Sequence, residues 1–151
     1  MVVLHSVAPS ESRFGIDSDA VWTFQDRERV RLRGRTIRGE TAARDVWVCG
    51  PGAFVVLKAL AFRGRGEDKD AYDLYYVVHN YGAGLEDVAA RLRLVIGDAH
   101  ALHALAVLRK DFLDPDGVGP RRVAELLVRG PDPEIQADVV GFVKALLDRV
   151  S

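Results

Sequence analysis

Residues 51–63 read PGAFVVLKALAFR, and at this point the apolar pattern changes from the alternation typical of strands to the period of helices. Pro51 suits the first turn of a helix, and Gly64 and Gly66 are typical of its end. Lys58 is a single ammonium in the middle of these apolar residues. Burying that charge is costly unless a carboxylate or a phosphate meets it. The stretch therefore predicts an apolar helix whose lysine needs a partner.

Three aspartates follow from ten positions later, in the run Asp68-Lys69-Asp70-Ala71-Tyr72-Asp73. Asp70 and Asp73 are three apart, so they share one face of a second helix that opens near Asp68. On one interpretation they hold Lys58, or the whole group binds a phosphorylated ligand. On the other, Asp68 and Asp70 favour a helix N-terminus and Lys58 extends its head to solvent. Capping explains Asp73 less well.

The two sides of Pro51 differ in predicted secondary structure. Before it, the sequence predicts strands at Val2–Val7, Ala20–Phe24, Glu28–Ile37 and Asp45–Cys49. After the two helices at Pro51 and Asp68, apolar spacing and Gly or Pro breaks predict helices at Leu85–Ile96, Ala99–Leu113, Pro120–Val128 and Pro133–Val150. We expect one α+β domain over 1–151, with a β-rich part at 1–50 and a helical bundle at 51–151.

Composition narrows the classes of protein to which the chain can belong. The 151 residues carry 21 basic and 22 acidic side chains, so their net charge of −1 gives no global attraction to nucleic acid or anionic membranes. Cys49 is the single cysteine, which excludes an intramolecular disulfide and is typical of a reducing compartment. There is no signal-peptide pattern and no apolar run of about 18 residues. We expect a cytoplasmic protein without a membrane partner.

A local basic stripe stands out against this neutral balance. Alternate positions of one predicted strand are arginines, namely Arg29, Arg31, Arg33 and Arg35. Side chains at alternate positions of a strand share one face, and such a row of cations fits the phosphates of a nucleic acid. Charged residues on the solvent face of an amphipathic strand give the same pattern. Both interpretations stay open for this stripe.

The run from Val46 to Arg63, followed by KDAYDLY at 69–75, resembles the second half of the AbiEii/AbiGii-type nucleotidyltransferase toxins. Members of that family show a strand, a proline-led helix with K-x-x-A-x-x-x-R, and then K-D-x-x-D-L. The resemblance covers about thirty residues and implies a fold like that of DNA polymerase β. It implies catalytic roles for Lys58, Asp70 and Asp73, with Lys58, Lys69 and Arg63 as contacts of the nucleotide phosphates.

The chain departs from this family at the metal motif. The enzymes use a G-S motif followed by D-x-D, whose carboxylates hold the Mg²⁺ that serves the NTP. No such motif precedes the predicted strands. Asp17 and Asp19 form a D-x-D that could ligate a metal, but they stand where the family's third carboxylate belongs. Alternatively the strand at Val2–Pro9 occupies that place and its carboxylate is lost.

These observations predict an incomplete mixed sheet and a domain that is inactive alone. With the missing half supplied by an upstream protein, it would transfer a nucleoside monophosphate from an NTP to an RNA or protein hydroxyl. An antitoxin is the other partner that the resemblance implies, and a homodimer could cover the open sheet edge. The rival interpretation is a non-catalytic module that binds nucleic acid or protein. A third interpretation is a helical partner protein whose similarity to the toxin family is coincidental.

Overall fold

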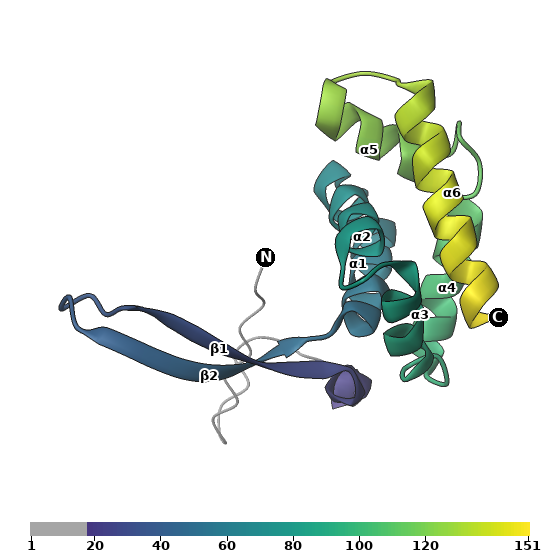
Figure 1. The fold of residues 1–151 in the computed structure, drawn as a ribbon. Helices are drawn as coiled ribbons and strands as arrows, with labels where there is room; N and C mark the ends of the chain where they lie inside the picture. The colour runs from purple at the N-terminus through teal and green to yellow at the C-terminus, as the bar shows by residue number, and fades with distance from the viewer. Residues whose placement is uncertain (1–17) are drawn as a thin grey trace.

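A computed structural model describes residues 18–151, with side chains described from Trp22 onward (Figure 1). A 3-10 helix η1 (Ser18–Gln25) precedes two strands, β1 (Arg27–Arg35) and β2 (Thr41–Cys49). Six helices follow, namely α1 (Pro51–Arg65), α2 (Asp68–Asn80), α3 (Leu85–Arg93), α4 (Ala99–Asp111), α5 (Val118–Val128) and α6 (Pro133–Val150). The α+β class is confirmed. The strand expected at Val2–Val7 lies outside the described residues.

The expectation of a strand at Ala20–Phe24 is wrong, because these residues belong to η1. A strand would place Trp22 and Phe24 on one face. Instead Trp22 is 4% exposed and Phe24 is 47% exposed. Trp22 stacks on His100 of α4, with ring centroids 6.0 Å apart. Packing of one large ring against the helices therefore outweighs the strand propensity of the segment.

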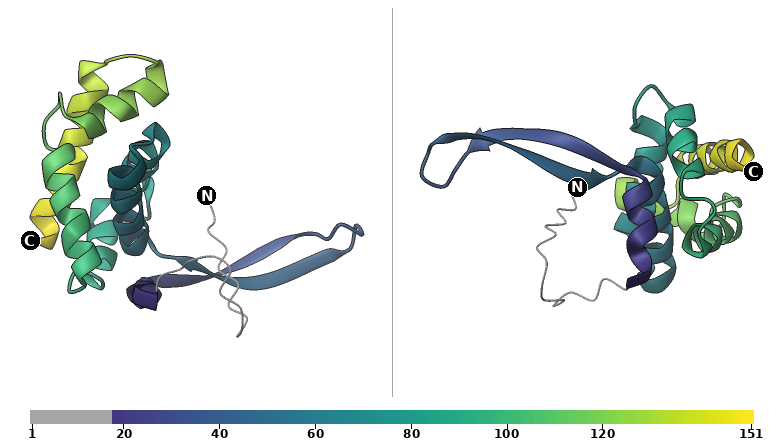
Figure 2. Two further views of the ribbon diagram at one scale, coloured as in Figure 1. Left: turned by 180° about the vertical axis from the view of Figure 1, so that it is seen from behind. Right: turned by 90° about the horizontal axis from the view of Figure 1, so that it is seen from below.

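The strands β1 and β2 form an antiparallel hairpin in register from Arg27 opposite Cys49 to Arg35 opposite Thr41. Gly39, with φ of +82°, occupies the tight connection that antiparallel pairing permits. Figures 1 and 2 show this ribbon projecting from the helices, and we call residues 27–49 the arm. Among the described residues, the sheet has these two strands only, so the mixed sheet implied by the family resemblance is not seen there.

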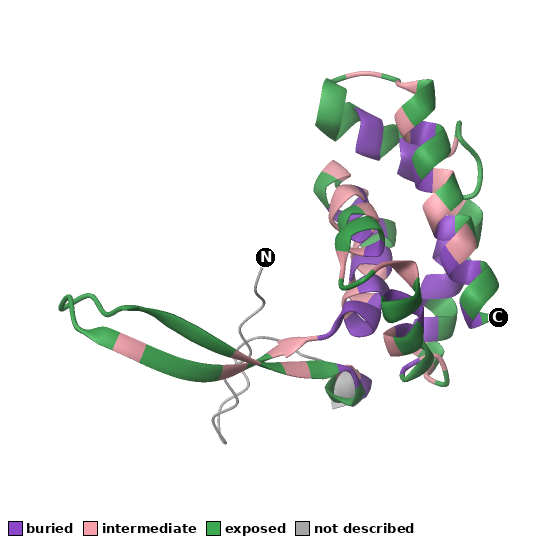
Figure 3. Cartoon of the chain, viewed as in Figure 1, coloured by how far each residue is buried: buried purple, intermediate pink, exposed green. Residues whose placement is uncertain are grey.

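The helices pack around α1, which contacts α2, α3 and α4, while α6 closes the far side against α3 and α5. Figure 3 shows buried positions gathered along the helices and an arm that is exposed over most of its length. The largest fully buried side chains include Phe112, Leu74, Leu92, Leu108 and Leu146. The core thus lies among the six helices, with Trp22 of η1 packed into it.

Local signals set several helix ends. Gly66 ends α1 in a left-handed conformation, with φ of +67°, and donates its N–H to the Phe62 carbonyl. Asp132 caps α6 by accepting from the backbone N–H groups of Glu134 and Ile135. The helices α3 and α4 end earlier than predicted, at Arg93 and Asp111, and α5 begins earlier, at Val118.

Candidate functional site

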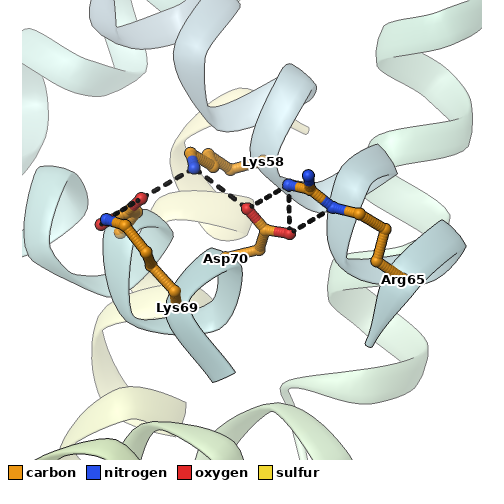
Figure 4. Close-up of polar contacts among 5 residues, drawn as sticks. Lys58, Arg65, Lys69 and Asp70 are labelled. Atoms are coloured by element: carbon orange, nitrogen blue, oxygen red, sulfur yellow. Dashed lines mark hydrogen bonds and ion pairs between the residues drawn. The ribbon is translucent and has the colours of Figure 1, made fainter. Parts of the chain in front are cut away.

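Lys58 points from α1 toward α2, where it meets two carboxylates (Figure 4). Its Nζ lies 3.0 Å from Asp70 Oδ1 and 2.7 Å from Asp73 Oδ2. The Lys58 side chain is 9% exposed and that of Asp70 is 2% exposed. The structure therefore confirms the predicted contact, and the interpretation in which the ammonium extends into solvent is wrong.

Two further cations surround these carboxylates at the surface. Arg65 donates from Nε and Nη2 to Asp70 Oδ2, at 3.1 and 2.7 Å, and Lys69 Nζ lies 3.2 Å from Asp73 Oδ1. Their side chains are 61% and 62% exposed. We call these five residues the Lys58 cluster. It holds three cations and two anions, so it keeps one positive charge in excess.

Arg65 was missed as a site residue by the sequence analysis, which named Arg63 instead. Residues seven apart on a helix lie on nearly the same face, so Arg65 follows Lys58 after about two turns. Residues five apart differ by about 140° around the helix axis, which turns Arg63 away from Lys58. Arg63 is exposed and stands outside the cluster. The seven-residue spacing was the signal that could have identified Arg65.

The connection between α1 and α2 is what brings the charges together. Gly66 and Glu67 alone separate the two helices, and the left-handed Gly66 turns the chain back sharply. The first turn of α2 then lies beside α1, with Asp70 at its third position. The Phe54 ring lies 5.6 Å from Lys58 Nζ and adds a cation–π contact on the apolar side.

Burial and pairing act in opposite directions on the pKa values of this cluster. Burial lowers the pKa of Lys58, but hydrogen bonds to Asp73 and Asp70 outweigh it, so the pKa lies above its usual value. Burial raises the pKa of Asp73, and the contacts with Lys58 and Lys69 more than reverse this, so its pKa lies below the usual value. Both groups are therefore charged near neutral pH.

A second polar cluster, which the sequence analysis did not find, fixes the base of the arm. Asp26 is fully buried and accepts from the backbone N–H of Ala53 at 2.7 Å, which caps α1. Arg91 of α3 pairs with both Asp26 and Glu28, and the Tyr81 hydroxyl donates to Glu28. We call Asp26, Glu28, Tyr81 and Arg91 the arm anchor. Its members are up to 65 residues apart in sequence, so no local pattern reveals it.

Close backbone approach supports the arm anchor. A Cβ on Gly50 would collide with the Asp26 carboxylate, and one on Gly52 would collide with the backbone of Arg91. Glycine at these two positions lets the start of α1 lie directly against α3. Burial and the Asp26 carboxylate raise the pKa of the neighbouring Cys49 thiol, so this cysteine stays protonated and weakly nucleophilic at neutral pH.

The remaining predicted residues lie apart from the Lys58 cluster. Arg29, Arg31, Arg33 and Arg35 are exposed on the arm. Asp17 lies outside the described residues, and Asp19 lies in η1 with its side chain not described. Between residues 18 and 151, no group of three His, Cys, Asp or Glu side chains is placed to hold a metal ion. A hollow of about 590 Å³ is lined by other residues, among them Arg121, Glu125 and Gln136.

None of the helices in the described part of the chain has the length and apolar character needed to cross a membrane. No protein-family model, curated protein or solved structure matches the chain.

Proposed function

We propose that this chain is a nucleotidyltransferase-like module of the toxin–antitoxin or abortive-infection type that is inactive alone. The observation that supports the proposal is the contact of Lys58 with both aspartates of the K-D-x-x-D-L motif. Buried ion pairs are poor stabilisers, and apolar residues of similar volume are often equally stable in their place. Three charges gathered below the surface therefore favour a functional role over a purely structural one.

The cluster suits phosphate better than it suits a metal ion. Each aspartate already contacts two cations, Asp70 with Lys58 and Arg65, and Asp73 with Lys58 and Lys69. A divalent cation at these carboxylates would face three positive side chains, so the described residues do not fit Mg²⁺. The excess positive charge and the exposed heads of Arg65 and Lys69 fit the phosphates of an NTP.

In this proposal the chain contributes phosphate contacts, and a partner contributes the carboxylates that hold Mg²⁺. Asp70 and Asp73 act as positioning residues that hold Lys58 and its two surface neighbours. The completed enzyme would transfer a nucleoside monophosphate to an RNA or protein hydroxyl, with an antitoxin as a further partner. We place the protein in the cytoplasm, where NTPs and RNA are present and where a lone Cys49 stays reduced.

Calorimetric titration with each NTP, with and without Mg²⁺, tests the proposal on the parent chain. Lys69→Ala and Arg65→Ala should weaken NTP binding severalfold, because each removes an exposed cation without touching the apolar core. Lys110→Ala removes an exposed lysine of α4 and serves as the matched control. Lys58→Met should abolish binding, provided that circular dichroism shows a folded chain. A parent chain that binds no NTP would contradict the proposed phosphate site.

A further inference from the structure

The charge of this protein is divided unevenly between the arm and the rest of the chain. Residues 27–49 carry seven arginines and three acidic side chains, a net charge of +4. Since the whole chain has a net charge of −1, the remaining residues together carry −5. The neutral overall balance therefore conceals a strongly basic projection from an acidic remainder.

Five of the seven arginines lie on one face of the arm together with an aromatic ring. Alternate positions of β1 from Arg27 to Arg35 share a face, and the strand register places Trp47 opposite Arg29 on that same face. Trp47 is 49% exposed. The opposite face is mostly aliphatic, with Val30, Leu32, Val46 and Val48, and it also carries Glu28 and Arg44. We call the face that carries Trp47 and the alternate arginines of β1 the arginine face.

Several cations of the arginine face are free to bind a ligand. Arg29 is paired with Asp45 at 2.7 Å, and the Arg27 guanidinium lies 4.3 Å from the centre of the Trp47 ring. Arg31, Arg33 and Arg35 are exposed, and no acidic side chain among the described residues forms an ion pair with them. The row of unpaired guanidinium groups thus extends toward the tip of the arm.

The length of the row defines the size of ligand that it fits. Arg35 lies eight positions after Arg27, which corresponds to about 27 Å of extended strand. A stacked nucleic acid strand advances about 3.4 Å per nucleotide, so the row spans about eight nucleotides. The arm anchor holds the base of this row through Asp26 and Arg91, so the row has a fixed attachment to the helices.

We propose that the arginine face binds single-stranded nucleic acid, with phosphates on Arg31, Arg33 and Arg35 and a base stacked on Trp47. Guanidinium groups form bidentate hydrogen bonds with phosphate. An exposed aromatic ring beside basic side chains is typical of proteins that bind single-stranded nucleic acid. A membrane-inserting ribbon would carry its aromatic ring on the aliphatic face. Here Trp47 stands among the arginines, which favours the nucleic acid.

Fluorescence anisotropy with a labelled twelve-nucleotide oligouridine and its DNA counterpart tests this proposal over a range of salt. The triple variant Arg31→Gln, Arg33→Gln, Arg35→Gln should bind about a hundredfold more weakly at 0.1 M salt, and the slope of log K against log salt should fall by about 2. The control changes three exposed cations of α1 and α4 to glutamine, namely Arg63, Arg109 and Lys110. This control should leave the affinity within about threefold of the parent.

The stacking of a base on the Trp47 ring is tested separately. Trp47→Ala should weaken binding about tenfold without changing the salt slope, and Trp47→Phe should restore most of the affinity, because stacking needs only an aromatic face. Circular dichroism of each variant verifies the fold. A parent chain that binds no oligonucleotide, or a duplex of equal length bound as tightly, would overturn the proposal. So would equal, arginine-dependent binding of polyglutamate or of anionic vesicles.

Discussion

The Lys58 cluster and the arm both concentrate positive charge, but they differ in how that charge is balanced. In the cluster, each cation contacts a carboxylate, and Lys58 is enclosed between α1 and α2. On the arm, Arg31, Arg33 and Arg35 extend from an exposed ribbon without acidic partners among the described residues. The cluster thus keeps an excess of one positive charge beside its carboxylates, whereas the three arginines of the arm offer their whole charge to an external anion.

The difference follows from what surrounds each region. Lys58 and Asp70 lie buried between α1 and α2, where an unpaired charge is expensive, and both have partners of opposite charge. The arm consists of two strands that no third strand covers within residues 18–151. Such a ribbon is marginally stable alone and exposes both faces to solvent. The arm anchor compensates at its base by tying Asp26 to α1 and α3.

The largest effect is expected from breaking the cluster at Asp70. Asp70→Ala leaves Lys58 buried with one carboxylate fewer, and it removes the partner of Arg65. The free energy of unfolding should fall by about 3–5 kcal/mol, measured by urea denaturation. Asp116→Ala disrupts the exposed pair with Arg121 and should cost less than about 1 kcal/mol. Equal losses from the two variants would show that Asp70 is not specially placed.

A somewhat smaller loss is expected at the arm anchor. Asp26→Ala removes the cap of α1 and the partner of Arg91, and we expect a loss of about 3 kcal/mol. Asp26→Asn keeps an acceptor for the Ala53 N–H but removes the charge, so it should recover part of this loss. The measurement is thermal unfolding followed by circular dichroism. If both variants melt like the parent, the arm is not fixed through Asp26.

The pH dependence of stability sharpens the comparison further. The pKa of Asp73 is lowered in the fold. Its contribution to the free energy of unfolding is therefore present above the unfolded pKa of about 3.9 and is lost as pH falls through the folded pKa. The pKa of Lys58 is raised, so its contribution is present below about 10.4 and is lost as pH rises through the folded value. Below pH 4, the urea midpoint of Asp73→Asn should therefore change less with pH than the urea midpoint of the parent chain. Parallel profiles would contradict this assignment.

The smallest effect on stability is expected on the arm. Arg31→Gln, Arg33→Gln and Arg35→Gln each remove an exposed, unpaired guanidinium, and each should change the free energy of unfolding by less than about 0.5 kcal/mol. Chemical denaturation of the single variants measures this. A loss of more than 1 kcal/mol would indicate that these arginines stabilise the fold and are not reserved for a ligand.

Sequence reasoning succeeded where the physical signal was local. Pro51 and Gly66 marked the limits of α1, and the cost of burying Lys58 predicted its contact with Asp70 and Asp73. The alternation from Glu28 onward predicted β1. Each of these inferences depends on residues within about fifteen positions of one another, or on a charge that demands a partner wherever it lies.

The rest depended on tertiary contacts that no short pattern encodes. The segment around Trp22 has strand propensity but forms η1, because the Trp22 ring packs against His100 of α4. Asp26 and Arg91 joined across 65 residues. Alternation in β1 showed which side chains share a face, but it could not show that the ribbon projects from the helices. Whether a strand lies in a sheet or stands free is decided by its neighbours in space.

The most direct test of the contrast between the two regions is one NMR titration. Side-chain ¹⁵N resonances of the lysines and arginines would be followed while twelve-nucleotide oligouridine is added to the parent chain. We predict that the Nε signals of Arg31, Arg33 and Arg35 shift while the Nζ signal of Lys58 stays in place. A shift of Lys58, or an arm whose arginine signals do not move, would contradict the account.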